Sequence, residues 1–437
     1  MAKKQQRYIR ELRELKDKPM SRQSDRLDAI DAIKKKLRGR DLAYHEVFSI
    51  MDEIADDRLG DILTTYFAAA SFSEGFSSKE LYYLTKAMVE TGTTLDFPGI
   101  VADKHSIGGV AGTRTTLIVV PIVVAAGFTM PKTSSRAITT PAGTADVMEL
   151  FSHVTFTPEQ VKNIVHKVGG CILWGGHLGI APADDVIIRV EEPLSFESFD
   201  KIIVSIMSKK IAMSINHLII DMPMGKTMKI TYEKDATLVK NKFEQIADHF
   251  GIHINVDINH TREPAGDGVG ATLEAIDVLK VLEQQKDRPM ELEKRSLRLA
   301  SELLDMCYKT KRIEKDGMTE AKKILSSGKA REIFLEIVKA QHGNPTVEST
   351  DFKPPKYTQR ILSKTSGTIK NINNFNINAI AKILGAPDNK QAGIAIMKHI
   401  GDTVTKREVL LELQTTSAFH LQEAADTLPS FPIYTIE

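Results

Sequence analysis

The segment HLIIDMPM, residues 217–224, decides the fold class of this sequence of 437 residues. It is a short apolar run, and comparable runs occur at FTMPK (128–132), CILWGG (171–176) and IHINVDI (252–258). Glycine-rich turns and helical patterns separate the runs, which is typical of a mostly parallel α/β sheet. We therefore predict a mixed α/β sheet in the middle of the chain, with ligands on the loops that follow its strands.

The residues before the sheet have helical periodicity instead. Two apolar stripes recur at helical spacing: Leu27, Ile30, Ile33 and Leu37 in the first, and Val47, Ile50, Met51 and Ile54 in the second. Ser77 and Glu80 match a capping box at the start of another helix, and Gly92 marks its end. Such short amphipathic helices must pack on one another, so we predict a helical domain.

The residues after the sheet divide into two parts. A charged stretch from Pro289 to Gln341 has helical character. The segment DFKPPKYTQ (351–359) marks a boundary, and the last residues alternate in short pieces typical of strands. We expect a separate, small α+β domain at the C-terminus.

Composition excludes several classes of protein. The 58 basic and 57 acidic residues nearly cancel, so no overall field attracts a nucleic acid or an anionic membrane. No apolar run reaches the roughly 18 residues of a membrane span, and the charged N-terminus is not a signal peptide. Two distant cysteines, Cys171 and Cys307, indicate a reducing cytoplasm rather than a disulfide scaffold. No metal-ligand spacing is present, and we expect no metal and no cofactor.

The loop ADKHSIGGVAGTRTT (102–116) combines cations, hydroxyls and glycines. Its glycines allow close backbone approach to a ligand, and a helix that begins near Thr115 favours an anion. Lys104, Ser106 and Thr115 add a charge and two hydroxyl donors, which together suit a phosphate. The alternative interpretation is an ordinary turn before a capped helix, with a solvated Lys and His.

The segment KTSSRAITTPAGTAD (132–146) has the same ingredients, and a helix is predicted to begin near Thr144. Two such loops can converge on one ligand. Neither matches a Walker A loop or a GxGxxG fingerprint, which disfavours an ATPase and a dinucleotide-dependent dehydrogenase.

A third polar region lies at WGGHLGIAPADD (174–185), which contains His177, Asp184 and Asp185. The following SIMSKK (205–210) places Ser205 and Lys209 four residues apart, on one helix face. The alternative for Lys209 and Lys210 is a solvated helix end.

These motifs carry a family resemblance. DKHSIGGV (103–110) resembles the signature loop of the thymidine and pyrimidine nucleoside phosphorylases. PKTSSRAITTPAGTADVMEL (131–150) resembles the AMP phosphorylase branch, whose members act on nucleoside 5′-monophosphates.

The resemblance runs from about Ile33 to the C-terminus. It implies a helical domain and a mixed α/β domain that flank a cleft, and a C-terminal α+β domain. The implied ranges are 1–95 with a second piece near 184–213, then 96–345 without that piece, and 352–437.

The resemblance implies cleavage of an N-glycosidic bond by inorganic phosphate. AMP-type members release a base and ribose 1,5-bisphosphate, and thymidine-type members form deoxyribose 1-phosphate. The implied phosphate contacts are Lys104, Ser106, Thr115, Ser134 and Thr144. The implied nucleotide contacts are Gly109, Ser135, Arg136, Ala137, Ile138, Thr139, Thr140, Thr144, Ser205 and Lys229, and Lys209 joins Ser205 in the base site.

Three residues are implied to act on the leaving base: His105, Asp184 and Glu197. Asp184 replaces the arginine with which thymidine-type members read a pyrimidine, and Glu197 replaces the AMP-type aspartate. GVAGT (109–113) also departs from the GVPGN that the AMP branch predicts. AMP-type members usually carry a further N-terminal domain. In this sequence, a short arm precedes the predicted helical domain.

Our leading hypothesis is an enzyme that phosphorolyses nucleoside 5′-monophosphates, with Arg136 and Lys229 as candidate cations for the 5′-phosphate. The alternatives are a thymidine or pyrimidine nucleoside phosphorylase and a non-catalytic nucleotide sensor. IMKHIGDTV (396–404) also faintly resembles a biotinyl or lipoyl carrier with Lys398 as its attachment point. The family resemblance suggests a homodimer or a larger homo-oligomer.

Overall fold

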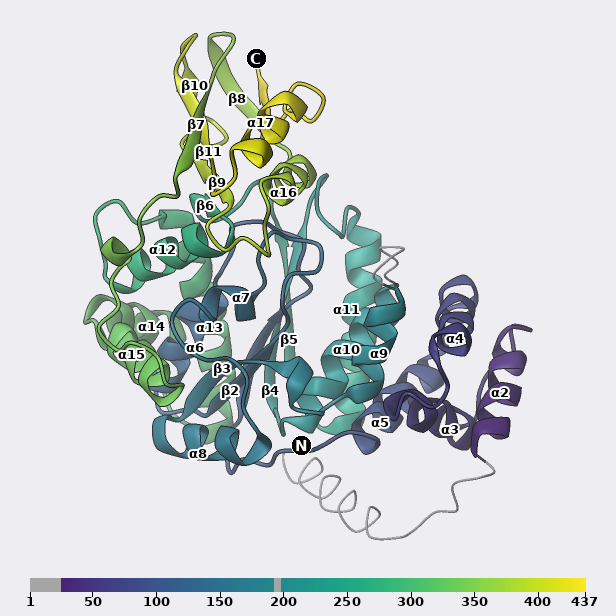
Figure 1. Ribbon diagram of the computed structural model, residues 1–437. Helices are drawn as coiled ribbons and strands as arrows, with labels where there is room; N and C mark the ends of the chain where they lie inside the picture. Colours follow the sequence, from purple (N-terminus) through teal and green to yellow (C-terminus); the bar gives the residue numbers. More distant parts are fainter. Residues whose placement is uncertain (1–24, 192–197) are drawn as a thin grey trace.

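The computed structural model describes residues 25–191 and 198–437. Figure 1 shows a helical bundle beside a central α/β region, with a C-terminal unit above the sheet. The predicted fold class is therefore confirmed: helical and α/β parts are both present, together with a C-terminal α+β unit. None of the helices in these two ranges combines the length and apolar character needed to cross a membrane.

Five parallel strands form the central sheet, in the spatial order β3-β2-β1-β4-β5. They are β1 (Ala102–Ser106), β2 (Met130–Ser134), β3 (Gly170–Trp174), β4 (His217–Met224) and β5 (His253–His260). A bridge between Val101 and Thr129 joins β1 to β2. The four apolar runs are thus confirmed as strands β2 to β5. The loop predicted at 102–116 instead begins with strand β1, which lacks an apolar pattern because four of its five residues are polar.

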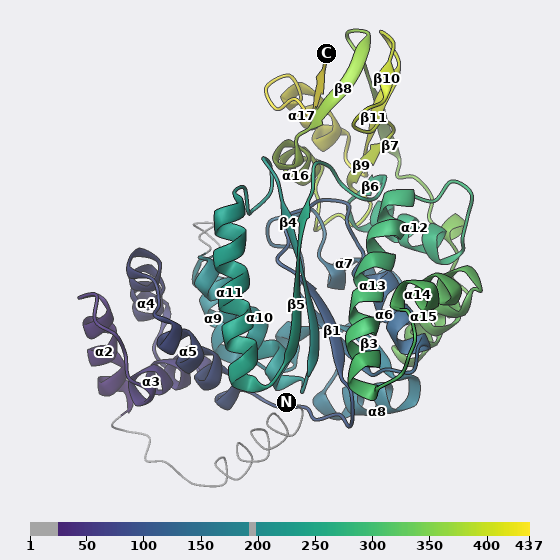
Figure 2. The same ribbon diagram turned by 180° about the vertical axis from the view of Figure 1, so that it is seen from behind.

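Helices cover both faces of this sheet (Figure 2). One face packs on α6 (Thr116–Ala125) and α13 (Met290–Lys311), with α12 (Ala271–Leu282), α14 (Gly317–Ser326) and α15 (Lys329–Ala340) behind them. The other face packs on α8 (Pro158–Val168) and α11 (Glu233–Phe250). The short helix α7 (Thr144–Met148) follows the loop after β2. The helix starts predicted near Thr115 and Thr144 are both confirmed.

The helical bundle contains two separate parts of the chain. They are α2 (Asp25–Lys36), α3 (Tyr44–Ala55), α4 (Asp61–Glu74) and α5 (Ser78–Glu90), then α9 (Pro182–Glu191) and α10 (Phe199–Ala212). The capping box of Ser77 and Glu80 is present, and the second apolar stripe is fully buried. The first stripe was partly wrong, because Leu27 and Leu37 are exposed and Ala29, Ala32 and Ile33 form the buried face.

The C-terminal unit is built from two antiparallel sheets and two helices. Its elements are β7 (Tyr357–Leu362), β8 (Gly367–Ile372), α16 (Asn374–Ile383), β9 (Gly393–Ile396), β10 (Thr403–Val404), β11 (Val409–Thr415), α17 (Ala418–Thr427) and β12 (Tyr434–Ile436). The four-stranded sheet also includes β6 (Gly268–Val269), which follows β5 in the central region. Strand β6 thus links the C-terminal unit to the segment that follows β5.

His399 also joins the two regions. Its Nδ1 lies 3.1 Å from Glu263 Oε2, and its Nε2 lies 3.1 Å from Asp267 Oδ1. Hydrogen bonds to Asp267 and Glu263 raise the pKa of His399 to about 10. The neighbouring Lys398 forms an ion pair with Glu408 at 2.5 Å.

The raised pKa of His399 makes a prediction about stability. A raised pKa stabilises the fold fully below the unfolded pKa of about 6.5, and this contribution is lost as pH rises through about 10. Because the side chain is 37% exposed, solvent screening limits the effect to about 1 kcal/mol. We expect His399→Gln to lower the melting temperature at pH 6 but not at pH 10.5. An equal decrease at both pH values would contradict the ion-pair assignment.

Candidate active site

The candidate site lies at the carboxyl ends of the parallel strands, where loops lead into α6 and α7. Successive side chains of β1 point to opposite faces of the sheet. Lys104 pairs in register with Ile219, which packs toward α6 and α13, whereas His105 pairs with Ile220, which packs toward the helical bundle. One short strand therefore supplies a cation to one face and an imidazole to the other.

Lys104 is held in place by buried polar partners. Its Nζ donates to Thr115 Oγ1 at 2.9 Å and lies 3.2 Å from Asp221 Oδ2. Arg295 donates to Asp221 Oδ1 at 2.8 Å from the other side. Burial raises the pKa of Asp221, but Arg295 and Lys104 more than offset this, so its pKa lies well below the usual range. Asp221 therefore remains ionised and fixes two cations at the edge of the sheet.

Asp103 holds two further lysines on the opposite face of β1. Lys210 Nζ, from α10, lies 2.6 Å from its Oδ2, and Lys132 Nζ, from β2, lies 3.4 Å from its Oδ1. Burial lowers the pKa of Lys132 well below its usual value, and the charge of Lys210 lowers it further. This arrangement links the helical bundle directly to the strand that carries Lys104.

We call these six residues the cationic cluster: Lys104, Lys132, Lys210, Arg295, Asp103 and Asp221. All six are buried, and four basic groups against two carboxylates leave an excess of two basic groups. Unpaired buried charge is costly, so an excess of buried basic groups over carboxylates favours a bound anion. The side chain of Thr115, the N-cap residue of α6, makes no capping hydrogen bond, so the start of this helix adds partial positive charge at the same end of the strands.

His105 lies within reach of this positive field. Burial lowers its pKa well below the usual value, and the charges of Lys210, Lys132, Lys104 and Lys209 lower it further. None of the described residues forms a hydrogen bond with its buried Nδ1. His105 is therefore neutral in the unliganded site, and a neutral imidazole can donate a hydrogen bond to a substrate from one nitrogen.

The predicted phosphate hydroxyls differ in what they offer an anion. Thr115 Oγ1 accepts from Lys104, Ser106 Oγ accepts from the Gly108 N–H at 3.3 Å, and Thr144 Oγ1 accepts from Arg114 at 3.3 Å. Accepting leaves the hydroxyl hydrogen to donate elsewhere. Ser134 instead donates its hydroxyl to the Leu173 carbonyl at 2.9 Å.

Arg114, which sequence reasoning did not select, ties the two predicted loops together. It lies in the first loop (102–116) and donates to the Ala142 carbonyl in the second loop at 2.8 Å. Its guanidinium also pairs with Glu274 of α12 at 2.6 Å, and Glu274 is buried. The bonds to Ala142 and Thr144 hold the start of α7 close to the start of α6.

The residues predicted to contact the base lie together on the helical bundle. Asp184 Oδ2 accepts from Ser205 at 2.8 Å and from Lys209 at 2.5 Å, which joins α9 to α10. Asp184 Oδ2 thus already faces a hydroxyl and an amine in this conformation. The adjacent Asp185, which was not selected as a catalytic residue, has its pKa raised to about 6 by burial. Glu197 lies outside the described residues.

The second loop is anchored by Asp146 at its end and by Glu149, which follows it in the chain. Arg136 pairs with Glu149 at 2.7 Å and with Asp146 at 3.2 Å, and its guanidinium lies 4.9 Å from the Trp174 ring centroid. Asp146 also accepts from the Ala137 N–H at 2.7 Å. Other residues of this loop lie as follows: Ser135 and Ile138 are exposed, and Thr139 and Thr140 are half-buried. The charge of Arg136 is thus already matched by carboxylates, unlike that of the cationic cluster.

Gly109 and Lys229 lie against each other. A Cβ atom on Gly109 would approach Lys229 Cγ to 2.9 Å, and the glycine has φ of 90°, so both space and backbone require glycine. Ala111 stands where the resemblance predicts proline. Its N–H donates to Asn374 Oδ1 at 2.9 Å, a hydrogen bond that proline could not form.

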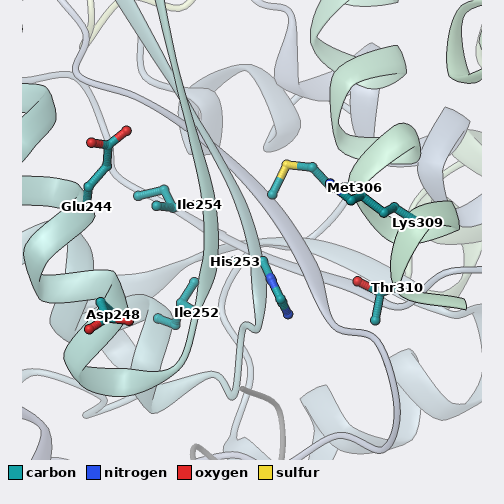
Figure 3. Close-up of a pocket in the computed structure, with 8 residues that line it drawn as sticks. All are labelled: Glu244, Asp248, Ile252, His253, Ile254, Met306, Lys309 and Thr310. Carbon is teal, nitrogen blue, oxygen red and sulfur yellow. The ribbon is translucent and has the colours of Figure 1, made fainter.

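A separate groove of about 700 Å³ lies away from this site (Figure 3). Its lining includes His253 and Ile254 at the amino end of β5, Asp248 of α11, and Met306 and Lys309 of α13. It therefore opens at the edge of the sheet opposite the cationic cluster. Within residues 25–191 and 198–437, no His, Cys, Asp and Glu side chains form a group of three that could hold a metal ion.

Family models cover most of the chain. The helical bundle domain of a glycosyl transferase family matches residues 30–92, and the a/b domain of the glycosyl transferase family matches residues 99–331. The chain belongs to this glycosyl transferase family. This confirms the predicted family and enzyme class, and the glycosyl transferase is a pentosyltransferase of the phosphorylase type.

Two named relatives are similar to this chain over 90% of its length. A protein of Rhodopseudomonas palustris named "Putative thymidine phosphorylase" is 42% identical over 400 residues, 90% of this chain and 76% of that protein. The "AMP phosphorylase" of Natronomonas pharaonis is 39% identical over 396 residues, 90% of this chain and 78% of that protein. An anthranilate phosphoribosyltransferase from Thermus thermophilus superposes with a TM-score of 0.60 over 72% of this chain and 100% of its own. At 16% identity it shows the fold alone.

Proposed function

We propose that this glycosyl transferase cleaves the N-glycosidic bond of nucleoside 5′-monophosphates such as AMP with inorganic phosphate. The products are the free base and ribose 1,5-bisphosphate. The observation that carries the proposal is the cationic cluster, in which four buried basic groups outnumber two buried carboxylates and so favour an anion such as phosphate. The similarity to an AMP phosphorylase supports the choice of nucleotide.

The chemistry requires one bond to form and one to break. A phosphate oxygen attacks C1′ of the sugar while the bond from C1′ to the base nitrogen breaks. The proton of HPO₄²⁻ is formally transferred to the base, so no other reactant is needed. The protein contributes by aligning phosphate with C1′ and by stabilising the departing base.

The site divides these two tasks between the two faces of strand β1. Lys104, Thr115 and Ser106 lie where phosphate is proposed to bind, with the uncapped start of α6 beside them. Ser205 and Lys209 lie on the helical bundle, where the base is proposed to bind. His105 lies on the same face of β1 as Lys210, so we place it near the leaving base. No resident cofactor is part of this proposal.

A thymidine or pyrimidine nucleoside phosphorylase is the second candidate, favoured by the relative that is 42% identical. Asp184 argues against it. A carboxylate that already accepts from Ser205 and Lys209 cannot donate the hydrogen bonds with which an arginine reads a pyrimidine. A sensor on this fold would bind nucleotides without releasing base.

One assay separates these candidates. We expect the protein with phosphate to release base from AMP, CMP or UMP, and much less from uridine or thymidine, as measured by chromatography. Omission of phosphate serves as the control and should abolish release. Activity on thymidine alone would overturn the nucleotide proposal, and binding without base release from any substrate would favour the sensor.

A further inference from the structure

The loop that follows β1 (residues 107–115), which we call the phosphate loop, contacts more than the central region. Its residue Ala111 is fully buried, and it packs within the hydrophobic core of the C-terminal unit, together with Ile369, Ile377 and Ile394. The tip of the loop that follows β1 is therefore embedded in a part of the chain more than 250 residues away.

One side chain of the C-terminal unit makes this contact specific. Asn374, the first residue of α16, is fully buried. Its Nδ2 donates to the Gly109 carbonyl at 2.6 Å and to the Thr227 carbonyl at 3.1 Å, and its Oδ1 accepts from the Ala111 N–H at 2.9 Å. One amide thus uses both donor hydrogens and its acceptor on two loops of the central region.

These two loops contain residues on which the proposed function depends. Gly109 is part of the loop between His105 and Thr115, and the loop at Thr227 leads to Lys229, whose side chain lies against Gly109. The backbone N–H of Asn374 adds a longer contact to Thr227 Oγ1 at 3.4 Å. Asn373 caps α16 by accepting from the Asn376 N–H at 3.1 Å, which fixes the start of the helix.

We propose that Asn374 is a positioning residue, which sets the spacing between the phosphate loop and the Lys229 loop and so makes the C-terminal unit part of the active site. It acts through Gly109 and Ala111 and touches no reacting atom. The inference rests on the proposed function, since it assigns a role in binding the substrates of that reaction. This role differs from simple domain packing, because a hydrophobic contact alone would not fix the distance between the two loops.

The test compares variants that change this amide with one that only weakens the C-terminal unit. Asn374→Asp keeps the size and the acceptor but removes both donors, and Asn374→Ala removes all three bonds. The control is Thr415→Val, because buried Thr415 donates to the Leu384 carbonyl at 2.7 Å within the C-terminal unit. All four proteins are assayed with phosphate varied at saturating nucleotide, and their melting temperatures are measured with and without phosphate.

We expect both Asn374 variants to raise the KM for phosphate about tenfold, the loss that corresponds to one displaced hydrogen-bonding group. Thr415→Val should lower the melting temperature and leave this KM unchanged. A wild-type KM in both Asn374 variants, or an equal change in Thr415→Val, would overturn the inference.

The same four proteins also separate a failure of this inference from a failure of the proposed function. If the wild-type protein releases no base, the proposed function fails. Positioning is then judged by the rise in melting temperature that inorganic phosphate produces. A rise that is reduced in Asn374→Asp and kept in Thr415→Val supports the inference, and an equal rise in all variants overturns it.

Discussion

Replacing Lys104 with methionine is expected to lower kcat/KM for phosphate by roughly 10²- to 10³-fold, the usual effect of removing one preorganised group that stabilises charge. Lys104 is 2% exposed, and its Nζ donates a hydrogen bond to Thr115 Oγ1 at 2.9 Å. Thr115 is the N-cap residue of α6, and its side chain makes no capping hydrogen bond. Methionine fills much of the same volume, so the change removes the charge and leaves packing largely intact. Initial rates of base release at varied phosphate measure the effect.

Lys294→Met is the matched control, because its side chain is 79% exposed and lies on α13, far from the loops in sequence. It should retain the wild-type rate. A Lys104→Met protein with the wild-type KM for phosphate would show that the cationic cluster is not the phosphate site.

Replacing Asp221 with asparagine is expected to lower the free energy of unfolding by about 3 kcal/mol, the typical effect of breaking a buried ion pair by removing one partner. Asp221 is 1% exposed and lies between Lys104 at 3.2 Å and Arg295 at 2.8 Å. Asparagine keeps the shape but leaves two buried cations without their counter-charge. Thermal and denaturant unfolding at pH 7 measure the loss.

Asp257 offers a control on the neighbouring strand, where it pairs in register with Asp221. Its partner Arg298 is 38% exposed, which screens the pair, and burial raises the pKa of Asp257, so this carboxylate gains little from its partner. Asp257→Asn should therefore change stability little. Equal losses in the two variants would contradict the role assigned to Asp221.

The parts of the fold that the sequence predicted are those with a strong local pattern. Strands β2 to β5 are short apolar runs, and the second helical stripe has four buried residues at regular spacing. Strand β1 lacks this pattern, because Asp103, Lys104, His105 and Ser106 are polar residues at the centre of a buried sheet. Functional sites are where the apolar pattern of a strand is most often broken.

The candidate site was predictable only where its residues are neighbours in sequence. Lys104 and Thr115 lie in one glycine-rich loop, and their composition indicated a phosphate site. The partners that hold them lie much farther along the chain: Arg295 is 74 residues from Asp221, and Asn374 is 265 residues from Gly109. Contacts of such separation leave no local pattern, although a single aspartate inside the apolar run of β4 was a signal for Asp221.

Analysis of the products by ³¹P NMR tests the central claim most directly, that inorganic phosphate itself attacks the sugar. The protein is incubated with AMP and phosphate, and free base is measured in parallel. We predict that the inorganic phosphate signal falls as a new sugar phosphate signal appears, in a one-to-one ratio with adenine. Adenine released without any consumption of phosphate would contradict the account.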